Sequence, residues 1–400
     1  MNHSRLYKQI ADKKNVLEAY FEVVDRLDKK VLSNKLSGQD KAVLENYNFN
    51  INKFINAIQD ELQNKAPIIQ VITKKIPKPK GKHRLIYIYS IRDRIKAQAI
   101  FNVLEKVFEK KYSKNLYSYR RNRSANTATR RLIRKYKEAQ KNFVLVADIK
   151  DYTDTIDRKI LKLKLKNVPL PQDVLELLDL FIDNTTLTSS IQTGILQGIP
   201  LIGLFANYYL TDIDKIIQEK VDLYMRVGDD LILIDKKSSN LTLCKKILLT
   251  ETKKLKLTLK FQHNEVILIT KSFNYLGYNY CDNTIGIKQS SVTSFISRIK
   301  SNLKYNQYLS ETTRMRKLYH ILFRAENSVD KQISEFLKSH GFARNDKQMK
   351  LISQKLYTQY VRYIYKNYTP RNHRKLLQNI SYKLPSFYKR NIKMYYGKKI

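Results

Sequence analysis

Hydrophobic residues recur at helical spacing through the first part of the chain. Apolar side chains return every three to four positions over residues 16–27 and again over 54–62, with polar and charged side chains between them. Such spacing places the apolar side chains on one face of a helix. The pattern predicts an N-terminal helical extension over residues 1–70.

The pattern then becomes typical of strands. Residues 74–90 hold a basic Pro/Gly turn between two alternating runs, which predicts a hairpin. The continuous apolar run FVLVA over 143–147 has the length of a buried central strand, and Asp148 stands at its end. Helical spacing resumes from 157. Residues 224–235, YMRVGDDLILID, predict a second hairpin with Gly-Asp-Asp at its turn.

Two adjacent carboxylates stand at that predicted turn, Asp229 and Asp230. Taken alone they are compatible with an ordinary solvated bend, because Gly-Asp is common turn chemistry. A cation stabilises such a pair, since neighbouring like charges raise each other's cost of ionisation. Asp148, at the end of a buried strand, is poorly placed for solvation alone. We therefore expect a divalent-metal site built from Asp148, Asp229 and Asp230.

The charge of the chain indicates the kind of partner. Lys and Arg number 76 against 36 Asp and Glu, a formal net charge of +40. So large an excess favours a polyphosphate partner. No apolar run reaches the length of a membrane span, and the polar start is unlike a signal peptide. We expect a cytoplasmic protein that binds nucleic acid and no membrane.

The C-terminal region carries this excess furthest. Residues 291–400 hold 24 Lys and Arg against 5 Asp and Glu, and from residue 347 onward nine tyrosines alternate with fourteen basic residues and no acid. Aromatic rings stack on bases and cations pair with phosphates. The pattern predicts a basic helical, thumb-like element that grips nucleic acid; a helical bundle with solvated lysines is the alternative.

Six sequence blocks stand out along the chain. They are RLIYIYSIRDRIKAQAI (84–100), LYSYRRNRSANTA (116–128, similar to S-y-G-F-R-p-g-R-S), VADIKDYTDTI (146–156), GILQGIPLIGLFANYYLTDID (194–214, similar to G-x-P-Q-G-x-P-x-S-P-x-x-x-N-x-Y-L-x-x-x-D), YMRVGDD (224–230, similar to Y-x-R-Y-A-D-D) and FNYLGY (273–278). In sequence and in order these blocks resemble those of reverse transcriptases, closest to the bacterial group II intron, retron and defence-associated branch.

The resemblance implies an α+β right-hand polymerase: fingers, a palm whose antiparallel sheet carries the catalytic aspartates, and a helical thumb. The expected boundaries are 1–70 for the helical extension, 71–142 for the fingers, 143–288 for the palm with a fingers insertion around 160–200, and 289–400 for the basic thumb and C-terminal region.

The resemblance also implies a set of site residues. Asp148, Asp229 and Asp230 are the expected catalytic residues and ligands of two Mg²⁺, with Mn²⁺ as an alternative. Lys82 is a further basic candidate at the triphosphate. The expected nucleotide-binding residues are Arg84, Arg92, Arg120, Tyr152, Thr153, Gln197, Gly198 and His263.

Three departures from the family pattern concern nucleotide choice. Thr153 stands where an aromatic residue usually closes the pocket beneath the sugar 2′ position, so Tyr152 is the alternative gate. Val227 and Gly228 replace Tyr and Ala before the two aspartates. His263 occupies the place of a lysine near the leaving pyrophosphate, where a structural role and proton donation are both open.

The expected function is RNA-directed DNA synthesis from dNTPs. The template is RNA, more narrowly a dedicated non-coding RNA that serves bacterial antiphage defence, and the product is DNA. The alternatives are template-independent or protein-primed DNA synthesis, RNA synthesis, and an RNA-binding scaffold with a weak polymerase site. Association with a second copy or with a partner protein is left open.

Overall fold

The computed structural model describes residues 3–31, 50–68, 71–77, 83–139, 141–183 and 193–304, together with residues 336, 340–341, 348, 351–352 and 355. The chain divides into two compact units, Met1–Ile269 and Thr270–Ile400. Each is described by itself. Most of the predicted thumb, 289–400, lies outside the described residues.

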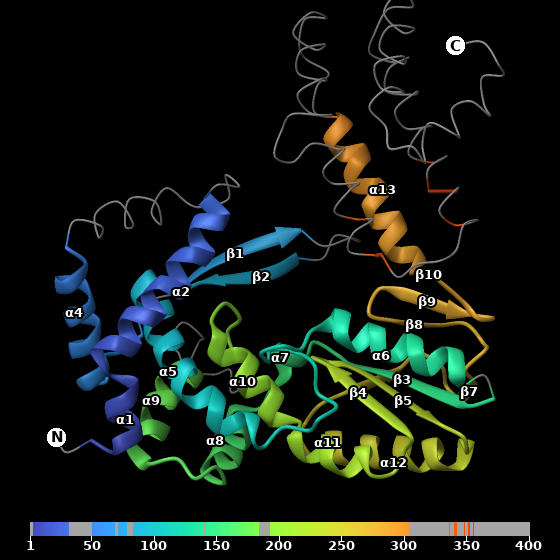
Figure 1. The fold of residues 1–400 in the computed structure, drawn as a ribbon, viewed down its shortest axis with the longest axis horizontal. Helices are drawn as coiled ribbons and strands as arrows, with labels where there is room; N and C mark the ends of the chain where they lie inside the picture. Colours follow the sequence, from blue (N-terminus) through green and yellow to red (C-terminus); the bar gives the residue numbers. More distant parts are fainter. Residues whose placement is uncertain are drawn as a thin grey trace, which may run out of the picture. The chain divides into compact units, whose positions relative to one another are not determined.

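The N-terminal part is helical, as the hydrophobic spacing predicts (Figure 1). Its helices pack against α5, whose buried face includes Ile95, Ile100 and Leu104. The side-chain amide of Asn15 joins three of them, since it donates to the carbonyls of Ile10 and Ala99, which lie in two other helices, both at 2.9 Å. The helices are α1 (Arg5–Ile10), α2 (Lys13–Val31), α4 (Ile51–Gln63) and α5 (Ile91–Glu109).

The predicted basic hairpin is present. Strands β1 (Ile72–Pro77) and β2 (His83–Ile88) pair antiparallel from Ile72 opposite Ile88 to Pro77 opposite His83. Residues 78–82, with Lys82, lie outside the described residues.

A five-stranded sheet forms the centre of the first unit, with strand order β4-β5-β3-β6 and β7 also paired to β3. The apolar run FVLVA becomes the central strand, buried along most of its length. All pairings in this sheet are antiparallel. The strands are β3 (Phe143–Ile149), β4 (Leu223–Val227), β5 (Asp230–Asp235), β6 (Leu259–Phe261) and β7 (Ile267–Leu268).

The outer edge of β4 is also paired. The N–H of Tyr117 donates to the carbonyl of Arg226, and the N–H of Arg226 donates to the carbonyl of Asn115, both at 2.9 Å. A parallel bridge joins Leu116 to Arg226. The segment 115–117 thus continues the sheet beyond its last strand.

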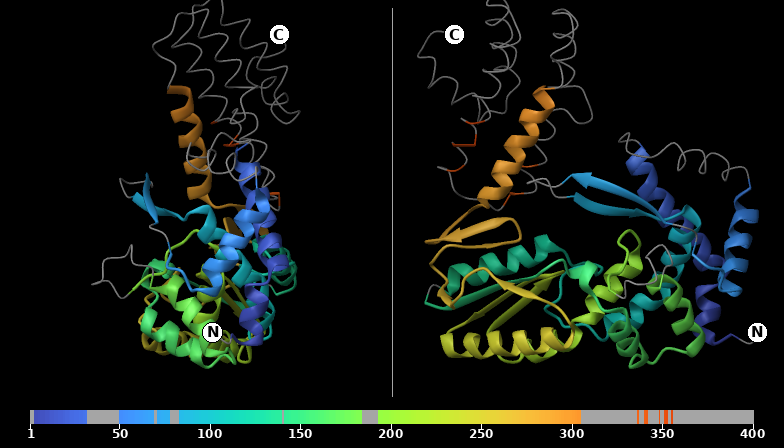
Figure 2. Two further views of the ribbon diagram at one scale, coloured as in Figure 1. Left: turned by 90° about the vertical axis from the view of Figure 1, so that its left-hand side faces the viewer. Right: turned by 180° about the vertical axis from the view of Figure 1, so that it is seen from behind.

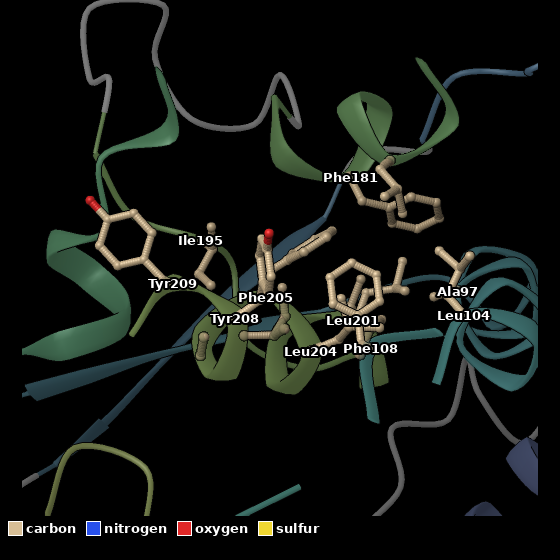
Figure 3. Packing of buried hydrophobic residues seen from close by; sticks show 14 of the residues in the cluster. Ala97, Leu104, Phe108, Phe181, Ile195, Leu201, Leu204, Phe205, Tyr208 and Tyr209 are labelled. Carbon is tan, nitrogen blue, oxygen red and sulfur yellow. The ribbon is translucent and has the colours of Figure 1, made fainter. Parts of the chain in front are cut away.

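Helices lie on both sides of this sheet, with α6 on one side and α11 and α12 on the other (Figures 1 and 2). Helix α10 is buried along almost its whole length, because its sequence PLIGLFANYY carries no charge. Figure 3 shows its Leu204 and Tyr208 among residues of α5; the ring of Phe108 meets that of Tyr208 edge to face at 5.1 Å. These helices are α6 (Ala125–Glu138), α7 (Tyr152–Thr155), α8 (Arg158–Lys166), α9 (Gln172–Ile182), α10 (Pro200–Tyr209), α11 (Thr211–Gln218) and α12 (Ser238–Lys254).

The second unit begins with a three-stranded antiparallel sheet of β8 (Phe273–Tyr275), β9 (Tyr278–Cys281) and β10 (Thr284–Ile287), followed by α13 (Gln289–Lys304). The FNYLGY block forms the β8–β9 hairpin. Its two turn residues, Leu276 and Gly277, both have positive φ, as a type I′ turn requires.

Candidate active site

Two of the three predicted aspartates are partners across the sheet. Asp148 near the end of β3 lies opposite Asp230, the first residue of β5. Residues directly opposite in an antiparallel pair point to the same face. Asp229 lies in the turn directly before Asp230, and its carbonyl accepts a hydrogen bond from the N–H of Ile149 at 3.2 Å. The fold therefore brings all three residues to one end of the β3–β5 pair.

The turn that carries Asp229 is tight. Val227 pairs with Asp230, so Gly228 and Asp229 alone connect β4 to β5. Gly228 has φ +66° and Asp229 is not among the residues with positive φ, the combination found in type II′ hairpin turns. Glycine adopts this φ without steric cost. This explains the glycine in the Gly-Asp-Asp triplet.

The donor chemistry of this site suits a hard dication. Like charges directly opposite each other destabilise a strand pair, and carboxylate oxygens are the ligands that Mg²⁺ prefers. In the described part of the chain, no three His, Cys, Asp or Glu side chains are gathered into a group that could hold a metal ion. The structure thus places the carboxylates of Asp148 and Asp230 opposite each other, with Asp229 next to them. For all three carboxylates to bind one metal ion, their side chains have to move closer together.

A buried ion pair lies directly behind the turn. Arg226 of β4 and Asp214 of α11 are both fully buried, and two guanidinium nitrogens donate to the two carboxylate oxygens at 2.7 and 2.6 Å. The hydroxyl of Tyr224 donates to the same carboxylate at 2.6 Å. A third guanidinium nitrogen of Arg226 donates to the carbonyl of Gly228 at 3.0 Å. The ion pair therefore reaches the turn itself.

The same network includes Asn207 of α10. Its side chain is fully buried, and the side-chain nitrogen donates to the backbone carbonyl of Ser118 at 2.9 Å. The backbone carbonyl of Asn207 accepts from the guanidinium of Arg226 at 3.2 Å. Burial acts to lower the pKa of the Arg226 guanidinium, but the charge of Asp214 and its hydrogen bonds raise that pKa above its ordinary value. Asn207 and Asp214 therefore lie in the core behind the turn and not on a helix surface.

Four of the predicted nucleotide-binding residues lie together. Arg120, Thr153, Gln197 and Gly198 line a cavity of about 720 Å³, whose other walls come from α2, α5, α10 and the neighbours of Arg120 in the segment 119–121. The side-chain amide of Gln197 donates to the hydroxyl of Thr153. At position 153 the cavity wall thus carries a threonine that is bonded to a glutamine.

The turn at Gly198 packs closely on the end of β2. Its φ is +134°, and a Cβ there would lie 2.8 Å from the carbonyl oxygen of Tyr87. The hydroxyl of Tyr89, which is buried, donates to the carbonyl of Leu196 at 3.2 Å. Only glycine combines this positive φ with the absence of a Cβ that would collide with the Tyr87 carbonyl.

Tyr152, expected as the alternative gate, lies in the core. Its side chain is 5% exposed, and its hydroxyl donates to the carbonyl of Ala206. Burial is the main cause that raises the pKa of this phenol well above its ordinary value. Tyr152 therefore stays neutral and faces α10 and not the pocket, which corrects the expectation.

Two of the predicted triphosphate-binding arginines are paired with acids. Arg92 donates to Glu61 of α4 at 2.7 Å and lies over the ring of Phe54. Arg120 donates to Glu109, and also to the carbonyls of Ser113 and Leu116 at 2.8 and 2.9 Å. Both guanidinium groups are therefore paired with acids in this structure, and their expected contact with a triphosphate stays a prediction.

The remaining predicted residues lie at the edges of the described structure. Arg84 belongs to β2, and its side chain is outside the described residues. His263 is exposed in the segment between β6 and β7. Lys260 was not predicted, yet β6 places it opposite Asp148. The alternation in LKLTLKF predicts a strand, but only the register shows that Lys260 shares a face with Asp148.

Comparison with known proteins agrees with this site. The family model described as "Reverse transcriptase (RNA-dependent DNA polymerase)" matches residues 76–280, just over half of the chain. The matched range contains Asp148, the LQGIP turn and the Gly-Asp-Asp hairpin. The chain belongs to the reverse transcriptase family, and its α+β fold is that of a right-hand polymerase.

Similar proteins include the putative COX1/OXI3 intron 1 protein of Saccharomyces cerevisiae, 24% identical over 177 residues. The match covers 43% of this chain and 21% of that protein, so the chain spans about a fifth of its length. Among solved structures, apo telomerase from Candida tropicalis matches at TM-score 0.42 and 15% identity, covering 85% of this chain and 67% of that one. Telomerase from Candida albicans with a telomeric RNA fragment matches at TM-score 0.40 and 14% identity, covering 82% and 66%.

Within the described ranges, no helix combines the length and the apolar character needed to cross a bilayer.

Proposed function

We propose that this chain is an RNA-directed DNA polymerase that joins dNTPs by metal-dependent phosphoryl transfer. The observation that carries the proposal is the register of β3 and β5, which sets Asp148 opposite Asp230 beside the Gly-Asp-Asp turn. Membership of the reverse transcriptase family supports it. In this proposal residues 71–142 act as fingers, 143–288 as the palm and 289–400 as the thumb.

The aspartates act by binding and orienting. Two Mg²⁺, or Mn²⁺, when bound, would neutralise the triphosphate and lower the pKa of the primer 3′-hydroxyl. Asp148 and Asp229 would hold the ions and Asp230 would support them. The chain's own contribution is therefore to fix the two strands and the turn, which phosphoryl transfer requires because it depends mainly on positioning.

The residues around Thr153 are proposed to select the sugar. The hydroxyl of Thr153 and the amide of Gln197 are bonded to each other at the cavity wall. Neither presents the ring that would exclude a 2′-hydroxyl. A preference for dNTPs would therefore have to come from the bonded pair of Gln197 and Thr153 itself.

A basic stripe on α6 supports a nucleic-acid partner. Arg130, Arg134 and Lys137 are exposed on α6. Residues at positions i, i+4 and i+7 lie on one face of a helix. A row of cations of this kind suits the phosphates of an RNA strand.

The biological setting is proposed from the resemblance alone. A non-coding RNA template, a cytoplasmic location and a role in bacterial antiphage defence stay predictions. Protein-primed or template-independent synthesis, and RNA synthesis, remain the competing activities.

Primer extension tests the proposal. Purified protein receives an RNA template with a DNA primer, Mg²⁺ and labelled dNTPs or NTPs, and the product is sequenced. We expect templated DNA synthesis, reduced at least about a hundredfold in Asp229→Asn, as for loss of a group that acts at the transition state. Asp222→Asn is the matched control, because Asp222 is an exposed acid at the opposite end of the same hairpin. The proposal is contradicted if the product is RNA, if its sequence does not follow the template, or if no condition gives any product.

A further inference from the structure

The peptide group of Gly228 is held from two sides. Its N–H donates to the hydroxyl of Ser118 at 2.9 Å, and its carbonyl accepts from the guanidinium of Arg226 at 3.0 Å. The pairing of Val227 with Asp230 closes the turn, but beyond the adjacent residues no atom lies within 4 Å of the place where a Cβ of residue 228 would stand. Glycine has the widest conformational freedom of any residue. The two hydrogen bonds therefore add a restraint on this peptide group that side-chain packing does not supply.

Ser118 is itself fixed. Its hydroxyl donates to the side-chain oxygen of Asn207 at 3.1 Å, and its carbonyl accepts from the side-chain nitrogen of Asn207 at 2.9 Å. The single hydroxyl proton is thus committed to Asn207, which leaves an oxygen lone pair directed at the N–H of Gly228. A chain of hydrogen bonds runs from buried α10 through Ser118 to the turn.

Ser118 and Gly228 are 110 positions apart in sequence. Both depart from the patterns that their blocks resemble: Ser118 stands at the glycine of S-y-G-F-R, and Gly228 at the alanine of Y-x-R-Y-A-D-D. The structure joins the two departures by one hydrogen bond. The flexible residue in the turn is paired with a side chain able to restrain it.

We propose that Ser118 is a positioning residue for the Gly228-Asp229-Asp230 turn, fixing through the Gly228 N–H the direction in which the two carboxylates meet a divalent cation. This rests on the proposed function for the identity of the ligand. Sites of this kind require their groups to be held within about 0.5 Å of the productive geometry. Ser118 acts through Gly228 and has no contact with the reacting atoms.

Amide exchange measures the restraint without any activity. Protein labelled with ¹⁵N-glycine has ten glycine sites, and the Gly228 signal is identified by its loss in Gly228→Ala. We expect Ser118→Ala to raise the exchange rate at Gly228 about five- to tenfold, the factor that one hydrogen bond contributes to an equilibrium. Ser118→Thr keeps the hydroxyl and the slow exchange. An unchanged rate in Ser118→Ala overturns the proposal.

The matched control is Ser124→Ala. Ser124 caps α6 by accepting from the N–H of Thr127 at 3.2 Å, so its loss removes a comparable hydrogen bond from the same part of the chain. It is expected to lower stability without changing exchange at Gly228. Equal acceleration at Gly228 in both variants shows a general loss of stability and overturns the positioning role.

Mn²⁺ binding shows whether the restraint by Ser118 affects the metal site or only the local structure of the turn. Mn²⁺ broadens signals of nearby nuclei, so titration into labelled protein reports the concentration that half-broadens Gly228. We expect this concentration to rise about threefold or more in Ser118→Ala, and to stay at the wild-type value in Ser118→Thr and Ser124→Ala. Equal values in all four proteins overturn the proposal. If wild type shows no broadening at Gly228, the metal centre fails and the proposed function fails with it, while the exchange rates still decide whether Ser118 restrains the turn.

Discussion

The charge pair between Arg226 and Asp214 is the most completely buried interaction of the candidate site. Removing one partner of such a pair leaves the other charge without compensation in the interior. We expect Asp214→Asn to lower the free energy of unfolding by about 3–5 kcal/mol. Urea denaturation measures the change.

The control for this variant is two residues away on the same helix. Asp212 of α11 is exposed and pairs with Lys164. Surface pairs contribute about 1 kcal/mol or less, so Asp212→Asn is expected to change little. Similar losses in the two variants would show that burial of Asp214 is not what matters.

Thr153 is expected to govern the choice between ribose and deoxyribose. Thr153→Phe introduces the ring that the family usually has and displaces the side chain of Gln197 from its present bond. We expect kcat/KM for ATP to fall at least about tenfold relative to dATP, since a ring beneath the sugar excludes a 2′-hydroxyl sterically. Equal ratios in wild type and Thr153→Phe would remove Thr153 from sugar selection.

At the scale of elements, the start of the N-terminal extension is attached to α9 through Asp173. Asp173 accepts from the N–H of Ser4 at 2.7 Å and from its hydroxyl at 2.8 Å. Burial acts to raise the pKa of Asp173, but these hydrogen bonds and one from the N–H of Val174 outweigh it and lower the pKa. Docking of α1 (Arg5–Ile10) on α9 (Gln172–Ile182) therefore depends on the ionised carboxylate.

This dependence has a definite sign. A carboxyl group whose pKa is lower in the folded state stabilises the fold fully above its ordinary pKa, and the contribution is lost as the pH falls through the folded value. We expect wild type to be more stable than Asp173→Asn at pH 6, and the difference to shrink steadily below about pH 4. Denaturation at a series of pH values measures it, and a constant difference would contradict the assignment.

The elements themselves were largely predictable from the sequence. The N-terminal helices, the basic hairpin, the central strand ending near Asp148 and the Gly-Asp-Asp hairpin all follow from local spacing, and all are confirmed. Local spacing cannot show tertiary partners. In the sequence, Asp214 is one polar residue of an amphipathic helix. Only the structure shows that Arg226 of β4 pairs with it.

The arginines illustrate the same limit within the candidate site. Arg92 and Arg120 lie in basic blocks, where a phosphate partner is the natural expectation. Their partners Glu61 and Glu109 come from other helices. The sequence shows how many cations a block holds, but only the packing shows which of them are already neutralised.

For the molecule as a whole, the net charge of +40 predicts strongly salt-dependent RNA binding. Replacing Arg130, Arg134 and Lys137 on α6 by Gln is expected to reduce the slope of log affinity against log salt by about one for each phosphate that the protein no longer neutralises. The control removes three charges at Lys237, Lys246 and Lys253, exposed at α12 on the other side of the sheet. Equal slopes in the two variants would indicate that total charge matters and its location does not.

The pairing of segment 115–117 with β4 limits how this chain can be divided. The two partners are more than a hundred positions apart, so the sheet is completed only when a distant segment pairs with it, and non-local pairing of this kind slows folding. A fragment beginning at Phe143 would expose the N–H and C=O groups of β4 and invite edge-to-edge association between copies. A fragment beginning before Asn115 would keep that edge covered, and light scattering on the two fragments would show whether the five-stranded sheet stays monomeric without the segment that precedes it.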